Sequence, residues 1–277
     1  MPTVALASPT DWKGWRNAAR NLCAQGVRPE AVEWQSGEAQ PGLFAEAADT
    51  ALTASPSVQT RVPSAFLTLS RLVICHRDAE RFARLYRLLF RLQREHHLLA
   101  NAADPDVAWA HGCAKAIRRD RHKMHAFVRF RKVGEQGGRE RFAAWFEPDH
   151  RIVELATPFF VRRFPNMDWA ILTPERSAIW QDGALRYEAG ASRQDVPDAD
   201  IVEVEWKAYF AAIFNPARLK VKAMTAEMPK KYWRNLPEAV LIPGLIAKAG
   251  DRSDAMRTDG VTEPNALSKR IARRRES

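Results

Sequence analysis

The hydrophobic pattern at the start of the chain predicts a short β-α-β-like segment over residues 1–35. Residues 3–7 have the apolar character of a strand, and Asp11 is placed to cap a helix whose apolar residues recur at helical spacing until Gly26. A second apolar run at residues 31–34 predicts another strand. Residues 36–62 are rich in Ser, Ala, Gln, Gly and Pro, which predicts a linker.

A helical pattern follows the predicted linker. Residues 64–74 are strongly apolar, and apolar positions over 78–96 recur with arginines on the other side, as in an amphipathic helix. Asp104 and Pro105 indicate the start of a further helix. We expect that helix to run, with or without a break, through Ala114 to Phe130.

The pattern then changes to that of short strands. Alternation at residues 142–146 predicts a strand, residues 147–150 a turn, and Ile152-Val153 a continuation of the strand. One or two helical turns are expected at 157–164. The remaining expected strands lie at 170–173, 177–180 and 185–187, the last two joined by an Asp-Gly hairpin.

Two helices, over 200–214 and 235–249, are expected to complete a main domain of residues 63–250. The basic residues 251–277 have few apolar positions and are predicted to be a disordered tail. The fold class is therefore α+β, a helical layer packed on a small antiparallel sheet.

Charge and cysteine usage narrow the classes of function. The chain has 277 residues and a net charge of +10, which favours an anionic partner. Its three cysteines form no CxxC pair, so neither a metal nor another cofactor is expected. No apolar run approaches the ~20 residues that span a bilayer. We therefore expect a cytoplasmic protein with no membrane association.

The densest basic stretch lies at residues 115–132. Its cations fall on two lines at helical spacing, as in helices that present cations to a phosphate backbone. A solvated basic face is the plainer interpretation. The first line comprises Lys115, Arg118, Arg119 and His122, and Lys123 lies next to it on the helix. The second line comprises Arg121, His125 and Arg129.

Two further stretches, 157–164 and 215–235, contain cations together with aromatic residues, the composition of a surface that follows a nucleic-acid backbone. Each also has a plainer interpretation as packing or irregular structure. The cations and the aromatic residue in question are Arg162, Arg163, Arg218, Lys220, Lys222, Lys230, Lys231 and Trp233.

Acid–base groups form a separate set of candidates: Asp120, His122, His125, Glu147 and His150. If these five met at one substrate atom, the chain could be a DNA-processing enzyme. His122 and His125 also have the spacing of a metal pair, but no nearby carboxylate or thiol completes a ligand set, so no metal is predicted.

Several long motifs resemble a family of DNA-metabolism and DNA-repair proteins of unknown function. The resemblance covers about residues 3–250. It rests on the motifs at 75–78 (Cys-His-Arg-Asp), 118–124 (Arg-Arg-Asp-Arg-His-Lys-Met), 142–150 (Phe-Ala-Ala-Trp-Phe-Glu-Pro-Asp-His), 159–163 (Phe-Phe-Val-Arg-Arg), 215–218 (Asn-Pro-Ala-Arg) and 228–233 (Met-Pro-Lys-Lys-Tyr-Trp).

The resemblance implies particular partners. Family members are encoded beside a radical-SAM protein of DNA-repair type or are joined ahead of a uracil-DNA glycosylase domain. This chain lacks that domain's iron–sulfur cysteines and uracil-pocket motifs, so uracil excision is not expected from it. The leading hypothesis is a DNA-binding repair accessory. The DNA-processing enzyme and a protein-interaction adaptor remain open.

Overall fold

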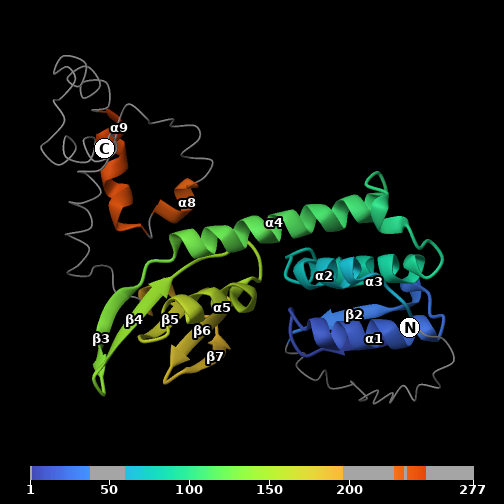
Figure 1. The fold of residues 1–277 in the computed structure, drawn as a ribbon, viewed down its shortest axis with the longest axis horizontal. Helices are drawn as coiled ribbons and strands as arrows, with labels where there is room; N and C mark the ends of the chain where they lie inside the picture. The colour runs from blue at the N-terminus through green and yellow to red at the C-terminus, as the bar shows by residue number, and fades with distance from the viewer. Residues whose placement is uncertain (1, 38–59, 196–227, 234–235, 248–277) are drawn as a thin grey trace, which may run out of the picture. The chain divides into compact units, whose positions relative to one another are not determined.

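The computed structural model describes residues 2–37, 60–195, 228–233 and 236–247 (Figure 1). The chain divides into two compact units, residues 1–196 and 197–277. In the second unit, the described elements are α8 (Lys230–Trp233), a 3-10 turn (Pro237–Leu241) and α9 (Ile242–Ala247). The helix predicted at 200–214 and the tail at 251–277 lie outside the described residues, as does nearly all of the predicted linker.

The first unit has the α+β fold that the sequence predicts, and it begins with the expected β-α-β segment. Strands β1 (Thr3–Leu6) and β2 (Glu33–Ser36) pair in parallel, and α1 (Trp12–Ala24) connects them. Asp11 caps α1 by accepting a hydrogen bond from the backbone N–H of Gly14 at 2.8 Å. The second strand begins two residues later than predicted because Pro29–Ala31 form a 3-10 turn.

Trp15 joins the β-α-β segment to the helical layer. Its side chain is only 1% exposed, and its ring centroid lies 6.2 Å from that of Trp34 and 6.4 Å from that of Phe66. The indole N–H donates to the carbonyl of Phe82 at 3.2 Å. Because helix α1 contributes the ring and two helices of the next layer contact it, the N-terminal segment shares one core with that layer.

Three helices form the layer, and the longest of them, α4, also reaches the sheet (Figure 1). The helix predicted over 78–96 is shorter in the structure than in the prediction. The apolar run predicted at 64–74 forms a separate helix. Helix α4 has 23 residues without a break, and it ends at Phe127 rather than Phe130 because strand β3 follows. The three helices are α2 (Ser64–Val73), α3 (Arg81–Leu92) and α4 (Pro105–Phe127).

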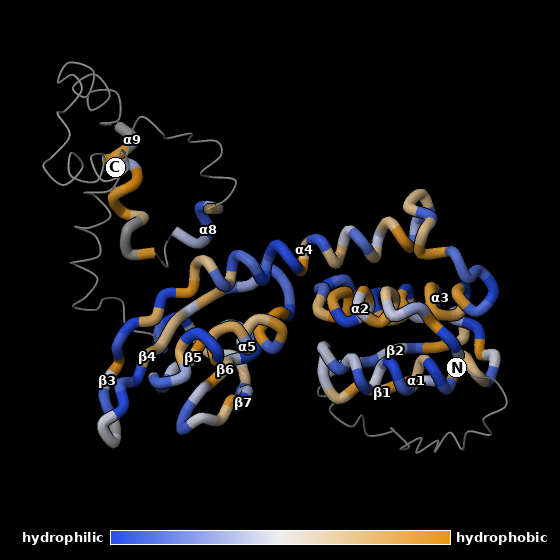
Figure 2. The backbone as a smooth tube through the Cα atoms, in the orientation of Figure 1, coloured by the Kyte–Doolittle hydropathy of each residue, from blue (hydrophilic) through white to orange (hydrophobic). Residues whose placement is uncertain are grey.

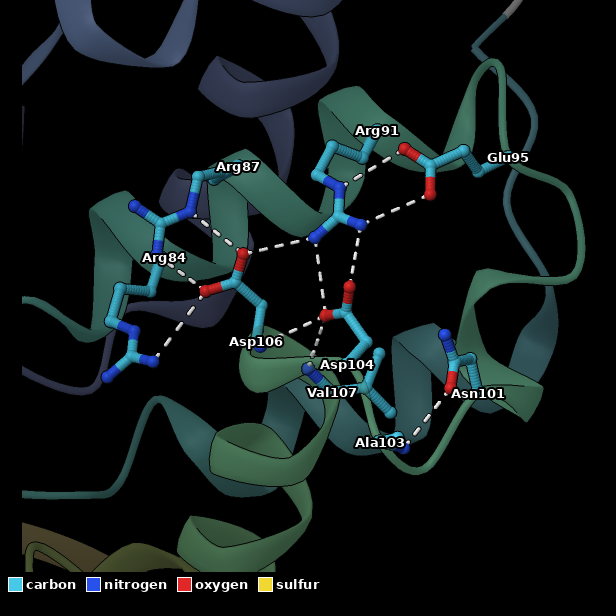
Figure 3. A network of polar contacts seen from close by, with 9 residues as sticks. All are labelled: Arg84, Arg87, Arg91, Glu95, Asn101, Ala103, Asp104, Asp106 and Val107. Carbon is cyan, nitrogen blue, oxygen red and sulfur yellow. Dashed lines mark hydrogen bonds and ion pairs between the residues drawn. The ribbon is translucent and has the colours of Figure 1, made fainter.

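A network of ion pairs fixes the start of α4 against α3 (Figure 3). Asp104 caps α4 by accepting from the backbone N–H of Asp106, and it pairs with Arg91 at 2.7 Å. Asp106 is buried and accepts from the Nε of Arg87 at 2.9 Å, with Arg84 at 3.6 Å. Arginines of α3 thus neutralise both carboxylates at the positive end of the α4 dipole.

Replacing Asp106 by asparagine is expected to lower the free energy of unfolding at pH 7 by about 1–3 kcal/mol, the range for hydrogen bonds to charged groups. Hydrogen bonding from Arg87 holds the pKa of Asp106 below its usual value. A lowered pKa stabilises the fold above the unfolded value of about 3.9 and ceases to do so as the pH falls through the folded value. The deficit of D106N should therefore shrink at pH 3 in urea titrations. Glu95→Gln, at a more exposed carboxylate of the network, is the control, and an equal loss in both variants would refute this account.

The sheet has five strands in the order β3-β4-β5-β6-β7. All neighbours are antiparallel except β4 and β5, which pair in parallel, so the sheet is mixed rather than purely antiparallel. Helix α5 (Val153–Arg163) makes the crossover that a parallel pair requires. The strands are β3 (Arg131–Gln136), β4 (Arg139–Trp145), β5 (Asp168–Leu172), β6 (Arg176–Gln181) and β7 (Ala184–Ala189).

Two sequence-based expectations about this region are wrong. Ile152 and Val153 do not continue a strand, because Ile152 is the N-cap of α5 and Val153 is its first residue. Strand β3 was not predicted at all: its residues are mostly polar and exposed, and its pairing with β4 depends on the turn at Gly137 and Gly138, both with positive φ.

An aromatic cluster packs α5 and the short segment after α4 onto the sheet. Phe160 and Trp169 are each 2% exposed, and their ring centroids are 6.2 Å apart. Phe130 lies within 5.9 Å of Phe160 and 5.7 Å of Trp169. This cluster fixes the C-terminal half of α4 relative to α5, where the candidate interface lies.

Candidate functional site

The solvent side of α4 carries four residues at the spacing that the sequence predicts. Lys115, Arg118, Arg119 and His122 are all exposed. The opposite side of the helix supplies the core, with Ile117 and Met124 fully buried. Figure 2 shows the middle of α4 as largely hydrophilic, in contrast to the apolar stretch of α2. We call these four exposed residues the basic face of α4.

The basic face of α4 differs from the arginine-rich helix α3 in its lack of counter-charges. Arg87 and Arg91 of α3 are both paired with carboxylates. Within the part of the chain that the structure describes, Lys115, Arg118 and Arg119 take part in no ion pair. Their positive charge is therefore available to an external anion.

The second predicted line of cations turns toward α5. His125 donates from Nε2 to the carbonyl of Ala156 at 3.2 Å, and its ring stacks on Phe159 at 4.2 Å. Burial is the main cause that lowers the pKa of His125, which keeps the imidazole neutral at pH 7. Arg121 and Lys123 are half-buried, and Arg129 donates to the carbonyl of Ala126 at 2.6 Å. His125 thus joins two helices.

The last turn of α5 adds cations next to this line. Arg162 and Arg163 are exposed, and Arg162 lies close enough to His125 to lower the pKa of that histidine. The two aromatic residues before them differ in environment: Phe160 is buried in the core, whereas Phe159 is half-buried against His125. Phe160 is therefore not accessible for stacking on a base.

The remaining basic candidates belong to the second unit. Lys230 and Lys231 are exposed on α8, and Trp233 donates its indole N–H to the carbonyl of Met228 at 2.9 Å. Arg218, Lys220 and Lys222 lie outside the described residues.

The structure brings together two of the five acid–base candidates. Buried Asp120 accepts a hydrogen bond from the backbone N–H of His150 at 2.8 Å, which fixes the turn before α5 on α4. Glu147 accepts from the indole N–H of Trp145 at 2.7 Å. His122 is on the exposed basic face, and His125 is held against α5. These positions do not assemble the five around one reacting atom.

Most of these candidate residues lie in a region that matches a known protein family. A family model described as a domain of unknown function, DUF4130, matches residues 79–238, more than half of the chain. The chain belongs to the DUF4130 family. The match takes in α4, α5 and the whole five-stranded sheet, while the β-α-β segment and α2 precede it. No curated protein and no solved structure gives a significant match.

In this DUF4130 member the fold also brings the motif at 75–78 next to His150, two features that the sequence offers only separately. The loop after α2 crosses the turn before α5, so that the backbone N–H of Arg151 donates to the carbonyl of Cys75 at 2.9 Å. The rings of His76 and His150 stack at 4.3 Å, and both are followed by an arginine, Arg77 and Arg151. The repeated His-Arg pair was the one available signal in the sequence.

In this cluster of two histidines and two arginines, both arginines pair with Glu175, and His76 is held by a backbone hydrogen bond. His76 accepts at Nδ1 from the backbone N–H of Asp78 at 3.1 Å, and burial is the main cause that lowers its pKa. Burial raises the pKa of the neighbouring Cys75 thiol to about 12, so this DUF4130 member does not carry a reactive thiolate there.

Proposed function

We propose that this chain binds nucleic acid through the basic face of α4 and serves as an accessory protein of DNA metabolism. The observation that carries the proposal is that three exposed cations in one line have no ion-pair partner within the described residues. On α3, by contrast, carboxylates lie close to Arg87 and Arg91. An unneutralised line of cations on a rigid helix suits a polyanion.

The geometry favours contacts to the backbone of the nucleic acid rather than to base edges. Lys115 and His122 are separated along α4 by about 10 Å, at the helical rise of about 1.5 Å per residue. Arg162 and Arg163 of α5 extend the positive surface beyond His125. Phosphate contacts of this kind position a protein on a strand without reading its sequence. Sequence-independent binding is therefore the expected mode.

A partner enzyme is a further part of the proposal. Its support is the resemblance to proteins that accompany radical-SAM or uracil-DNA glycosylase enzymes. The acid–base candidates are not gathered at one atom, which favours an accessory role over catalysis by these five groups. The chain would hold the nucleic acid while a partner supplies the chemistry.

Fluorescence anisotropy across a salt series tests the proposal. We expect the full chain to bind single- and double-stranded oligonucleotides of unrelated sequence, and each phosphate contact should add about 0.9 to the log–log salt slope on duplex. Affinity that does not change with salt would contradict it. Absence of binding to every oligonucleotide would also contradict it, and would favour an acidic protein as the partner of the basic face.

A further inference from the structure

A small cavity opens where the turn before α5 meets the α2–α3 loop and the β5–β6 turn. Its volume is about 120 Å³, and its apolar walls include Pro9, Pro148 and Pro174. Pockets that enclose whole small molecules measure roughly 300–1,000 Å³. This cavity is therefore of a size to receive one chemical group of a larger molecule, or a small ion.

Arginines outnumber carboxylates in the lining. Glu175 pairs with both Arg77, at 2.6 Å, and Arg151, at 3.4 Å, while Glu154 pairs with Arg176 at 2.6 Å. Three guanidinium groups thus share two carboxylates. The carboxylates hold the guanidinium groups at the cavity and leave it with a positive charge.

Arg81 adds a further positive charge next to the residues that line the cavity. Arg81 is 4% exposed and donates to the carbonyls of Pro9 at 2.8 Å and Ile74 at 2.9 Å. Burial and the neighbouring Arg151 lower the pKa of Arg81 to about 10, so the group remains charged at pH 7. Its hydrogen bonds go to main-chain carbonyls, and the nearby carboxylate of Asp78 offsets part of its charge, so Arg81 adds only modestly to the positive potential at the cavity.

Two hydrogen-bonding features also favour an anion in the cavity. The Nη1 of Arg151 is buried and has no hydrogen-bond partner, although nearly all buried polar groups in proteins have one. The first turn of α5 adjoins the cavity, and its N-cap residue, Ile152, offers no side-chain acceptor. The unpartnered nitrogen belongs to a residue that lines the cavity, and a helix N-terminus favours negative charge.

We propose that this cavity binds a phosphate group, with Arg151 as its main donor and Arg77 and Arg176 beside it. A cation is disfavoured by the excess of arginines, and an apolar group would leave that excess positive charge uncompensated. The phosphate belongs either to a free nucleotide or to the end of a nucleic-acid strand. The site uses no residue of the basic face of α4, so it stands independently of the proposed function.

Isothermal titration calorimetry on the full chain tests this site, with inorganic phosphate, a 5′-mononucleotide, and a tetranucleotide with either a 5′-phosphate or a 5′-hydroxyl. We expect Arg151→Gln to weaken phosphate binding at least about tenfold, the effect of one lost charge-assisted hydrogen bond. Glu175→Gln removes a competing carboxylate and should strengthen binding. An increase of affinity cannot result from misfolding, so this variant keeps the proposal testable if R151Q is unstable.

The comparison of ligands identifies the source of the phosphate. Tighter binding of the 5′-phosphorylated tetranucleotide than of the mononucleotide would assign the site to a strand end, and the reverse order to a free nucleotide. The triple variant K115A/R118A/R119A should bind inorganic phosphate as the unmodified chain does, which separates this site from the basic face. Equal phosphate affinity in R151Q and the unmodified chain, or no saturable binding at millimolar phosphate, would overturn the proposal.

Discussion

Replacing Lys115, Arg118 and Arg119 together by alanine is expected to weaken nucleic-acid binding about 100-fold near 0.1 M salt. Each lost phosphate contact lowers the log–log salt slope by about 0.9 on duplex DNA, and three such contacts account for most of that loss. The three side chains are exposed and take part in no ion pair within the described residues, so the fold should keep its stability. Anisotropy titrations at several salt concentrations measure both quantities.

The chain offers a matched control for this variant. Lys13, Arg16 and Arg20 are exposed on α1 and comprise, like the first set, one lysine and two arginines. The variant K13A/R16A/R20A therefore removes the same net charge from the same compact unit. If binding depended on net charge alone, both variants would lose the same affinity. That result would rule out α4 as the contact surface.

Trp15→Ala is expected to lower the free energy of unfolding by about 3–5 kcal/mol, the range for truncation of a buried aromatic side chain. The ring is 1% exposed between α1 and the helical layer, and its N–H donates to Phe82. The variant leaves a cavity and removes one hydrogen bond to the carbonyl of Phe82. Chemical denaturation followed by circular dichroism measures the loss.

Trp12→Ala is the control for that measurement, because it removes the same side chain from a more exposed position on the same helix. Its ring lies against Arg71, 4.2 Å from the centroid, and its N–H donates to Ser70. A smaller loss is expected, since less apolar area is uncovered. Equal losses in the two variants would contradict the greater contribution of the buried ring of Trp15 to this contact.

The sequence predicted those helices and strands that are specified by neighbouring residues. Asp11 and the helical spacing after it predicted α1, and Asp182-Gly183 predicted the β6–β7 hairpin. The parallel pairing of β4 with β5 could not be predicted, because it depends on a crossover rather than on local alternation. Helix α5 was also obscured, since it begins with Val153 and contains Pro158, both unfavourable to helices.

The same distinction applies to the two candidate sites. The basic face of α4 follows from spacing within eight residues, so the sequence sufficed to place Lys115 and His122 on one side of a helix. The cavity could not be found in this way. Its residues come from four separate segments, at 8–10, 77, 148–154 and 173–176, and only the tertiary fold brings them together.

Chemical modification of lysines tests most directly whether nucleic acid contacts the basic face of α4. The chain is treated with an amine-acetylating reagent with and without a saturating oligonucleotide, and modification at Lys115 and Lys13 is quantified by mass spectrometry. Both lysines are exposed in the structure. The account predicts that the oligonucleotide slows modification of Lys115 several-fold and leaves Lys13 unchanged. Equal modification of Lys115 in the free and saturated chain would contradict it.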